Sequence, residues 1–239
     1  MHVPDGFFDT PVTVAAAVTA AAGIGVALRR SRLELGERAA PLAGLVTTFV
    51  FAAQMLNYPV AAGVSGHLIG GVLAAILVGP ATGVLCVSVV LLMQLFFADG
   101  GVTAYGVNVT LMALVPIAVG YPLFWLVLRL WPDRRTGRTG RTGRTGRTSA
   151  VVAAGLGAAV SVPAAALAFT GLYWLGGAVP VPLATLATGM LAVHLPIGLG
   201  EGLITAATVS AVLATRPDLV RSVPAAPSPA APREVSDAR

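Results

Sequence analysis

The sequence has few charged side chains, no lysine and a single cysteine. Charged residues make up 10% of its 239 residues, against 56% hydrophobic ones, whereas soluble domains carry roughly a quarter charged residues. This scarcity of charge excludes an ordinary soluble domain. The lone Cys86 excludes a disulfide framework. Without lysine the chain has no Walker A motif, so nothing in it indicates ATP hydrolysis.

Long charge-free stretches occupy residues 10–28, 39–98, 100–128 and 149–200. A bilayer-spanning helix needs about 20 apolar residues, and continuous runs of this kind exclude β-barrel strands. Between the glycine, proline and aspartate breakers, helices are expected at 11–28, 41–57, 64–78, 81–98, 105–130, 150–175 and 183–214. We therefore predict an all-α membrane protein with about seven transmembrane helices, of which the short, glycine-rich third is a candidate for a broken or re-entrant element.

The basic residues indicate the orientation. All 15 are arginines, and they gather in residues 29–38, in residues 129–147 and after Thr215. The positive-inside rule then predicts an outer N-terminus and a cytoplasmic C-terminus in a multi-pass protein of the cell (inner) membrane, rather than a nucleic-acid binder. Asp5, Asp9 and Asp99 fall on the outer face, where they are expected to form an acidic mouth that attracts cations.

Two segments differ from the apolar mass. The Arg-Thr-Gly repeat in residues 133–149 is expected to be a flexible cytoplasmic loop that anionic membrane lipid attracts. Residues 216–239 are rich in proline, alanine and serine and are expected to form a disordered cytoplasmic tail. Residues 1–215 are then the integral membrane domain, and residues 1–10 lack the positive charge of a signal peptide, which predicts that they belong to the mature protein.

Two of the three histidines, His2 and His67, fall on the outer side of this topology. A free Met1 amine, the deprotonated amide nitrogen of His2 and its imidazole Nδ1 form fused chelate rings in one plane. His67 is placed to supply a fourth nitrogen, and a square-planar nitrogen set suits Ni(II) or Cu(II) and can take Co(II). The alternative is that His2 is an untethered terminal residue and His67 a helix cap.

Two other constellations suggest different functions. Residues 63–66 read GVSG, the GxSG pattern of rhomboid intramembrane serine proteases, for which His194 could serve as the base. Close helix packing through small residues explains the same pattern. Glu201 follows His194 by seven residues on the same helical face. This intramembrane polar pair would suit the proton relay of a secondary transporter, or would pin helices together by hydrogen bonds.

Several segments together resemble the CbiM/NikM family, the cobalt- and nickel-specific membrane subunits (S components) of energy-coupling-factor ABC transporters. They are MHVPDGFF (1–8), QMLNYPVAAGVSGHLIGG (54–71), VGP (78–80), FADGGVTAYGVN (97–108) and HLPIGLGEGLIT (194–205), and the resemblance covers most of residues 1–215. Val64 departs from the threonine common in the family, and Leu111 from a frequent asparagine.

The resemblance implies a transport subunit without enzymatic activity of its own. Ni(II) or Co(II) is then the transported ion rather than a permanent cofactor, bound by Met1, His2 and His67. Ser65, Asp99 and Asn108 are expected as supporting residues around it. The implied partners are a transmembrane coupling subunit (the T component), ATP-binding subunits and a small accessory membrane protein.

Overall fold

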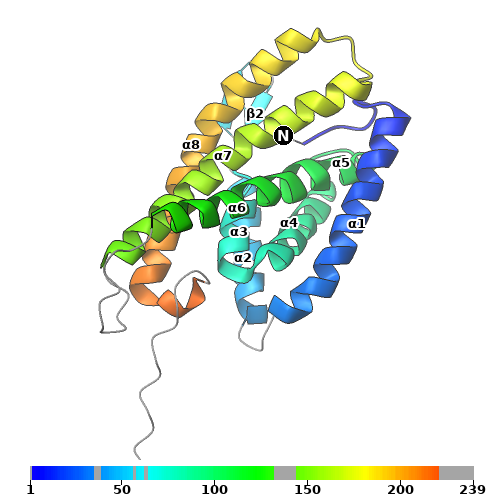
Figure 1. Ribbon diagram of the computed structural model, residues 1–239. Coiled ribbons are helices and arrows are strands. Elements are labelled where there is room, and N and C mark those ends of the chain that lie inside the picture. The colour runs from blue at the N-terminus through cyan, green and yellow to red at the C-terminus, as the bar shows by residue number, and fades with distance from the viewer. Residues whose placement is uncertain (1, 35–38, 56–57, 62–63, 132–143, 221–239) are drawn as a thin grey trace, which may run out of the picture.

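A computed structural model describes residues 2–34, 39–55, 58–61, 64–131 and 144–220 (Figure 1). Its helices and strands are α1 (Thr10–Glu34), α2 (Ala39–Gln54), β1 (Tyr58–Ala61), β2 (Val64–Gly66), α3 (Gly71–Val78), α4 (Pro80–Leu95), α5 (Tyr105–Val109), the π-helical turn η1 (Thr110–Leu114), α6 (Val115–Leu130), α7 (Arg144–Gly176), α8 (Leu183–Thr215) and the 3-10 turn η2 (Pro217–Leu219).

The short helix α3 lies at the centre of the molecule. All eight of its residues are buried, and α2, α4, α6 and α7 pack against it. Helix α1 covers α4 and α5 on one side, while α7 and α8 form a long pair on the other (Figure 1). Because α3 has neighbours all round, it is apolar on every face, as a fully buried helix must be.

Glycines allow the closest helix contacts. A Cβ atom on Gly202 of α8 would lie 2.8 Å from the carbonyl oxygen of Gly155 in α7. One on Gly106 of α5 would collide with the backbone of Ala17 in α1. Small residues at such crossings let helix backbones approach closely. Such packing holds helices together within lipid, where the hydrophobic effect does not drive their association.

Several helices are long and apolar enough to cross a membrane. They are Thr10–Glu34, Tyr105–Leu130, Gly146–Gly176 and Leu183–Thr215, and Ala40–Gln54 and Pro80–Leu95 are shorter apolar helices. Large apolar side chains also face outward, such as Val18 (63% exposed), Leu199 (67%) and Leu203 (73%). The chain is therefore a mainly helical membrane protein.

The third predicted helix differs most from the structure. It was expected over residues 64–78 but begins at Gly71, because residues 64–66 pair with β1 in an antiparallel hairpin. Gly70 then takes a left-handed conformation with φ +76°, which glycine adopts without steric cost. At roughly 1.5 Å per residue α3 is about 12 Å long, too short to cross a bilayer by itself. His67 thus lies ahead of the helix and does not begin it.

The predicted flexible loop is also shorter than expected. Residues 144–149 belong to the first turns of α7, because extending an existing helix costs less than starting one. Residues 132–143 of the predicted loop lie outside the described residues. The predicted tail starts with the η2 turn, closed by an ion pair between Arg216 and Asp218 at 2.8 Å, and residues 221–239 also lie outside the description.

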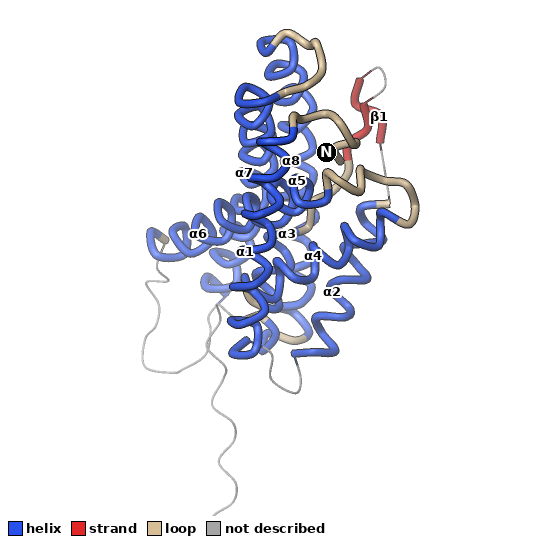
Figure 2. Tube along the Cα trace, turned by 90° about the vertical axis from the view of Figure 1, so that its right-hand side faces the viewer, coloured by secondary structure: helices blue, strands red, loops and turns tan. Residues whose placement is uncertain are grey.

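The two ends of the helical bundle carry different segments. Figures 1 and 2 show the N-terminal arm, the β1–β2 hairpin and the α7–α8 turn at one end of the molecule. The arginine-bearing end of α1 and the start of α7 lie toward the other end. We call the first the arm end and the second the arginine end.

Candidate metal centre

The N-terminal arm, residues 2–9, is built into the fold. Val3 is 1% exposed, and its N–H donates to Asn108 Oδ1 at 2.8 Å while its carbonyl oxygen accepts from Asn108 Nδ2 at 3.3 Å. The amide of Gly101 donates to the same carbonyl at 2.8 Å. The arm is thereby fixed to α5 and to the loop ahead of it, directly beside His2.

Asp5 secures the arm to the same loop. Its carboxylate accepts the amide of Thr103 at 2.8 Å and the Thr103 hydroxyl at 2.5 Å, and the amides of Val102 and Ala104 at 3.2 Å each. The hydrogen bond from the Thr103 hydroxyl is the main cause that lowers the pKa of Asp5 below its usual value. Asp5 is therefore a structural anchor rather than a free part of an acidic mouth.

The end of the arm binds the α7–α8 turn. The amide of Asp9 donates to Gly176 at 2.8 Å and the carbonyl of Phe7 accepts from Ala178 at 2.9 Å. The Asp9 carboxylate accepts the amide of Val12 at 2.9 Å, which makes it the N-cap of α1. Asp9, like Asp5, is therefore engaged with backbone amides, and among the three predicted outer aspartates only Asp99 contacts His2.

His2 and His67 stack on each other, with ring centroids 4.7 Å apart and planes 22° from parallel. His2 Nε2 lies 2.9 Å from Gln94 Oε1, and its Nδ1 lies 3.0 Å from Asp99 Oδ1. His67 is 4% exposed, and its Nδ1 lies 2.8 Å from the Leu68 carbonyl oxygen. A carbonyl oxygen accepts only, so Nδ1 of His67 carries the hydrogen and Nε2 the lone pair that a metal needs.

The electrostatics of the site follow from these contacts. The contact with the His2 side chain, whose Nδ1 lies 3.0 Å from Asp99 Oδ1, is the main cause that lowers the pKa of Asp99 below its usual value. Burial lowers the pKa of His67 well below its usual value, helped by the nearby His2. A neutral imidazole next to an ionised carboxylate favours a divalent cation, which takes deprotonated ligands.

Glu201 positions the segment that carries His67. Its carboxylate, 1% exposed, accepts the amides of Ile69 at 2.7 Å and Gly70 at 2.9 Å. His194 is bound elsewhere, with its Nδ1 2.7 Å from the Met190 carbonyl oxygen. The two members of the predicted intramembrane pair thus have separate partners, and Glu201 acts on the His67 segment.

The remaining predicted residues fall as follows. Asp99 contacts His2 and Asn108 contacts Val3 in the arm, and their supporting role at a metal site stays a prediction. Met1 lies outside the described residues. Ser65 is in β2, and its side chain is outside the description. Gln54 and Gln94, both 0% exposed, are not among the predicted site residues, although Gln94 contacts His2 directly. The signal that could have revealed them is that both are polar residues within apolar helices.

Side chains alone do not make a complete metal site in the described part of the chain. No group of three or more histidine, cysteine, aspartate or glutamate side chains there could hold an ion. The predicted nitrogen site would instead take its other donors from the backbone at the N-terminus.

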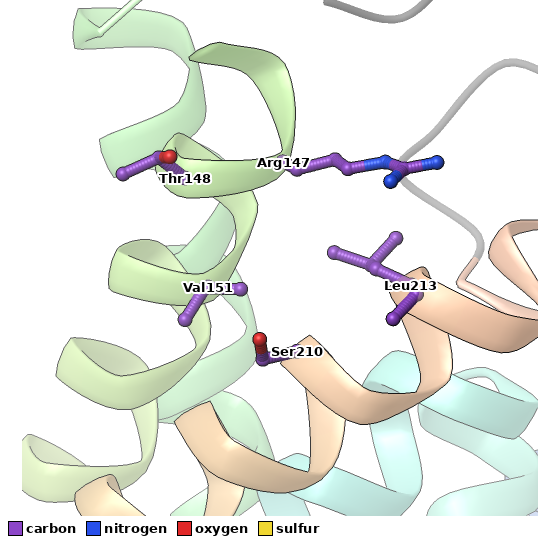
Figure 3. A pocket seen from close by; sticks show the side chains of 6 residues that line it. Arg147, Thr148, Val151, Ser210 and Leu213 are labelled. Carbon is purple, nitrogen blue, oxygen red and sulfur yellow. The ribbon is translucent and has the colours of Figure 1, made fainter. Parts of the chain in front are cut away.

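Two surface cavities lie away from His2. One, of about 260 Å³, is lined by Arg147, Thr148, Val151, Ser210, Leu213 and Ala214, between the start of α7 and the end of α8 (Figure 3). The other, of about 170 Å³, is lined by residues of α2, α3 and α8, nearly all of them apolar. Arg147 is the one charged side chain among these lining residues, so neither cavity offers ligands for a metal cation.

Comparison with known proteins identifies the relatives of the chain. A family model described as "Cobalt uptake substrate-specific transmembrane region" matches residues 2–219. A protein of Haloquadratum walsbyi, whose name describes metal transport, is 37% identical over 221 residues, 92% of this chain and 93% of its own length. The fused nickel transport protein of Rhodobacter capsulatus is 35% identical over 240 residues, 95% of this chain and 66% of its own length.

A solved structure has the same fold. The crystal structure of a truncated transition metal transporter superposes with a TM-score of 0.77 at 26% identity, and covers 90% of this chain and 99% of the transporter chain. Family, relatives and fold thus agree with one another.

Proposed function

The chain belongs to the cobalt-uptake family of substrate-specific transmembrane proteins, and from this membership we propose that it is the metal-binding subunit (S component) of an energy-coupling-factor transporter that imports Ni(II) or Co(II). The observation that carries the proposal is the stacking of His2 on His67 at 4.7 Å. This contact brings residues 65 positions apart in the sequence to one point beside the N-terminus.

We propose a square-planar site of four nitrogens. The Met1 amine, the His2 amide nitrogen, His2 Nδ1 and His67 Nε2 are its donors. Nitrogen donors in a plane suit d⁸ Ni(II) and accept Co(II). The hydrogen bonds of Val3 with Asn108 support this proposal, because they hold the peptide next to His2 in a fixed place and outer partners of this kind orient the groups that bind a metal. Ser65 remains proposed as a supporting residue.

The transport cycle is proposed in its simplest form. The metal binds at the arm end, on the outer face of the cell membrane, in a bundle of about seven membrane segments with the C-terminus in the cytoplasm; the short α3 is one of these segments and does not cross the bilayer by itself. ATP hydrolysis in separate ATP-binding subunits, transmitted by the T component and aided by a small accessory membrane protein, then moves the ion inward. The family described for cobalt uptake and the relative named for nickel transport support both metals as cargo. Residues 1–215 form the membrane domain in this proposal, and residues 216–239 the tail.

The test moves His2 by one position. We expect the purified protein to bind one Ni(II), and to show the absorption and diamagnetism of square-planar Ni(II). An alanine inserted between Met1 and His2 separates the amine from the His2 amide, and His67→Ala removes the fourth nitrogen. Each change should weaken Ni(II) and Co(II) binding by at least about 100-fold, since a chelate ring or a ligand is lost.

His194→Ala is the matched control. His194 is also a buried histidine, but its ring is bound to the Met190 carbonyl, so its loss should leave metal affinity unchanged. An insertion variant with the affinity and stoichiometry of the original protein would refute the N-terminal chelate. Uptake driven by a proton gradient without ATPase subunits would favour the secondary-transporter alternative, and labelling of Ser65 by a serine-directed probe the protease alternative.

A further inference from the structure

A chain of buried hydrogen bonds leads from a backbone carbonyl to the ring of His2. Gln54 in α2 donates from Nε2 to the carbonyl oxygen of Ile69 at 2.7 Å. Gln94 in α4 donates from Nε2 to Gln54 Oε1 at 2.9 Å, and its own Oε1 lies 2.9 Å from His2 Nε2. Both glutamines are 0% exposed. No bulk solvent therefore competes for these amide groups.

The direction of this chain is fixed at its far end. A carbonyl oxygen has no hydrogen, so Gln54 must turn its NH₂ group toward Ile69 and its oxygen toward Gln94. Gln94 must then turn its NH₂ group toward Gln54 and its oxygen toward His2. The orientation of each amide thus follows from counting hydrogens along the whole chain, which is how such groups are assigned.

The last bond decides where the His2 ring carries its hydrogen. Both ring nitrogens of His2 face an acceptor, Nε2 the Gln94 Oε1 at 2.9 Å and Nδ1 the Asp99 Oδ1 at 3.0 Å, and a neutral imidazole has only one N–H to donate. Gln94 is fully buried, so water cannot replace the ring as its donor, whereas the partly exposed Asp99 can bind water instead. The hydrogen of the neutral ring is therefore assigned to Nε2. The lone pair then lies on Nδ1. That nitrogen faces Asp99, whose side chain is 30% exposed, while Nε2 faces a fully buried partner. Nδ1 is therefore on the more open side of the ring.

The choice of nitrogen matters for chelation. The His2 amide nitrogen, Cα, Cβ, Cγ and Nδ1 close a six-membered ring with a metal, whereas Nε2 lies on the far side of the imidazole and cannot reach an ion held by the same residue's amide. A hydrogen on Nδ1 blocks the chelate, and a hydrogen held on Nε2 leaves it open. Outer partners of this type commonly fix the tautomer of a metal-binding histidine.

We propose that Gln54 and Gln94 are positioning residues that hold the ring hydrogen of His2 on Nε2 and so present Nδ1 to a divalent transition-metal ion. The metal half of this statement rests on the proposed function. The half that concerns the ring hydrogen does not, because it is a property of the metal-free protein.

The first measurement therefore uses no metal. Long-range ¹H–¹⁵N spectra of the full-length protein, labelled at its histidine nitrogens and recorded at alkaline pH, show which nitrogen of a neutral ring carries the hydrogen. His194→Gln and His67→Gln assign the signals. In the original protein the Nε2–H form of His2 should exceed the Nδ1–H form at least about tenfold, because a buried acceptor left without its donor is costly.

Substitutions at position 94 distinguish a specific effect on the His2 ring hydrogen from a general effect on the stability of the protein. In Gln94→Leu the Asp99 carboxylate becomes the one described partner of the ring, so the hydrogen should move to Nδ1. Gln94→Glu keeps an oxygen opposite Nε2 and, as the buried neutral acid, a donor toward Gln54 Oε1, so it should restore the Nε2–H form. Ser88→Ala is the matched control, since it also removes a buried polar group from α4, one that bonds only to Val84 in its own helix.

The second measurement adds Ni(II). Gln94→Leu should weaken Ni(II) binding about 10–100-fold, the usual effect of losing such a partner, while Gln94→Glu and Ser88→Ala stay close to the original affinity. A His2 hydrogen that remains on Nε2 in Gln94→Leu overturns the proposal. A hydrogen that moves without any loss of Ni(II) affinity overturns its metal half.

The two proposals fail differently. If the original protein binds no Ni(II) but Gln94→Leu still moves the ring hydrogen, the proposed function falls and the positioning role stands. If Gln94→Leu does not fold, Gln54→Leu decides, because it keeps the Gln94 side chain and removes the group that orients it. A reduced excess of the Nε2–H form in Gln54→Leu supports the proposal, and an unchanged excess overturns it.

Discussion

Glu201 and Glu34 are two carboxylates that bind backbone amides at the start of consecutive helices, one at each end of α3. Glu201 accepts the amides of Ile69 and Gly70, just ahead of α3, at 2.7 and 2.9 Å. Glu34 accepts the amides of Ala81 and Thr82, at the start of α4, at 3.2 and 2.7 Å. Negative charge at a helix N-terminus is favourable in both places.

The two carboxylates differ in the role of the segment that each one binds. Glu201 is 1% exposed and reaches from α8 to the peptides that follow His67, so it positions a proposed ligand. Glu34 is partly exposed at the end of α1 and also accepts the Thr82 hydroxyl at 2.8 Å, so it joins two helices. The same chemistry serves the proposed metal site at the arm end and helix packing at the arginine end.

The largest effect is expected from Glu201→Leu. It leaves two buried amides without acceptors and should lower the free energy of unfolding by about 3–5 kcal/mol. It should also weaken Ni(II) binding strongly, because the His67 segment loses its anchor. Thermal unfolding in detergent and Ni(II) titration measure the two effects, and Glu201→Gln, which keeps an acceptor oxygen, should fall between.

Glu34→Leu is the matched change at the other end. Water can replace part of its hydrogen bonding, so we expect a loss of about 1–2 kcal/mol and an unchanged Ni(II) affinity. If Glu34→Leu and Glu201→Leu lost Ni(II) affinity equally, both ends of α3 would influence metal binding. The proposed difference between the two carboxylates would then be wrong.

Gly101→Ala is expected to change the stability of the protein little but to weaken Ni(II) binding clearly. A Cβ there would collide with the backbone nitrogen of Asp5, so the arm must shift while the helices stay packed. We expect Ni(II) affinity to fall about tenfold or more, the scale of lost ligand positioning, with little change in unfolding temperature.

Gly79→Ala provides its control at the arginine end. There the Cβ would meet the Glu34 carboxylate at 2.5 Å, and the φ of +98° is one that alanine rarely adopts. Stability should fall by about 1–3 kcal/mol while Ni(II) affinity holds. The reverse pattern, with Gly79→Ala losing affinity and Gly101→Ala keeping it, would contradict the division between the two ends.

The smallest effect concerns Asp5 and pH. Its pKa is lowered in the folded protein, so the ionised carboxylate stabilises the arm above the unfolded value of about 3.9. That contribution is lost as pH falls below this value through the lowered folded pKa. The protection of the Thr103 amide against hydrogen exchange, taken relative to its intrinsic rate at each pH, should therefore fall over this range in the original protein, and should already be low and insensitive to this titration in Asp5→Asn.

The helices were largely predictable because apolar runs and breakers act locally. The segment expected at 183–214 is a helix over 183–215, and that expected at 105–130 is helical throughout. The prediction for the third helix is wrong at its start, since residues 64–70 (VSGHLIG) carry no charge and no proline, and so no local signal that separates a hairpin from the first turns of a helix. Helix α3 begins at Gly71, just after the two peptides whose amides donate to the Glu201 carboxylate. That carboxylate comes from α8, about 130 positions away in the chain.

The sequence by itself determined the membrane class and the family, and it predicted His2 as a metal ligand, because composition, charge placement and motifs can be read without a fold. Only the tertiary structure decided that His2 meets His67, that Asp5 and Asp9 anchor the arm, and that Gln54 and Gln94 form one directed chain ending on His2. Such contacts depend on side-chain directions and on backbone groups that distant helices bring together, and no local pattern encodes them.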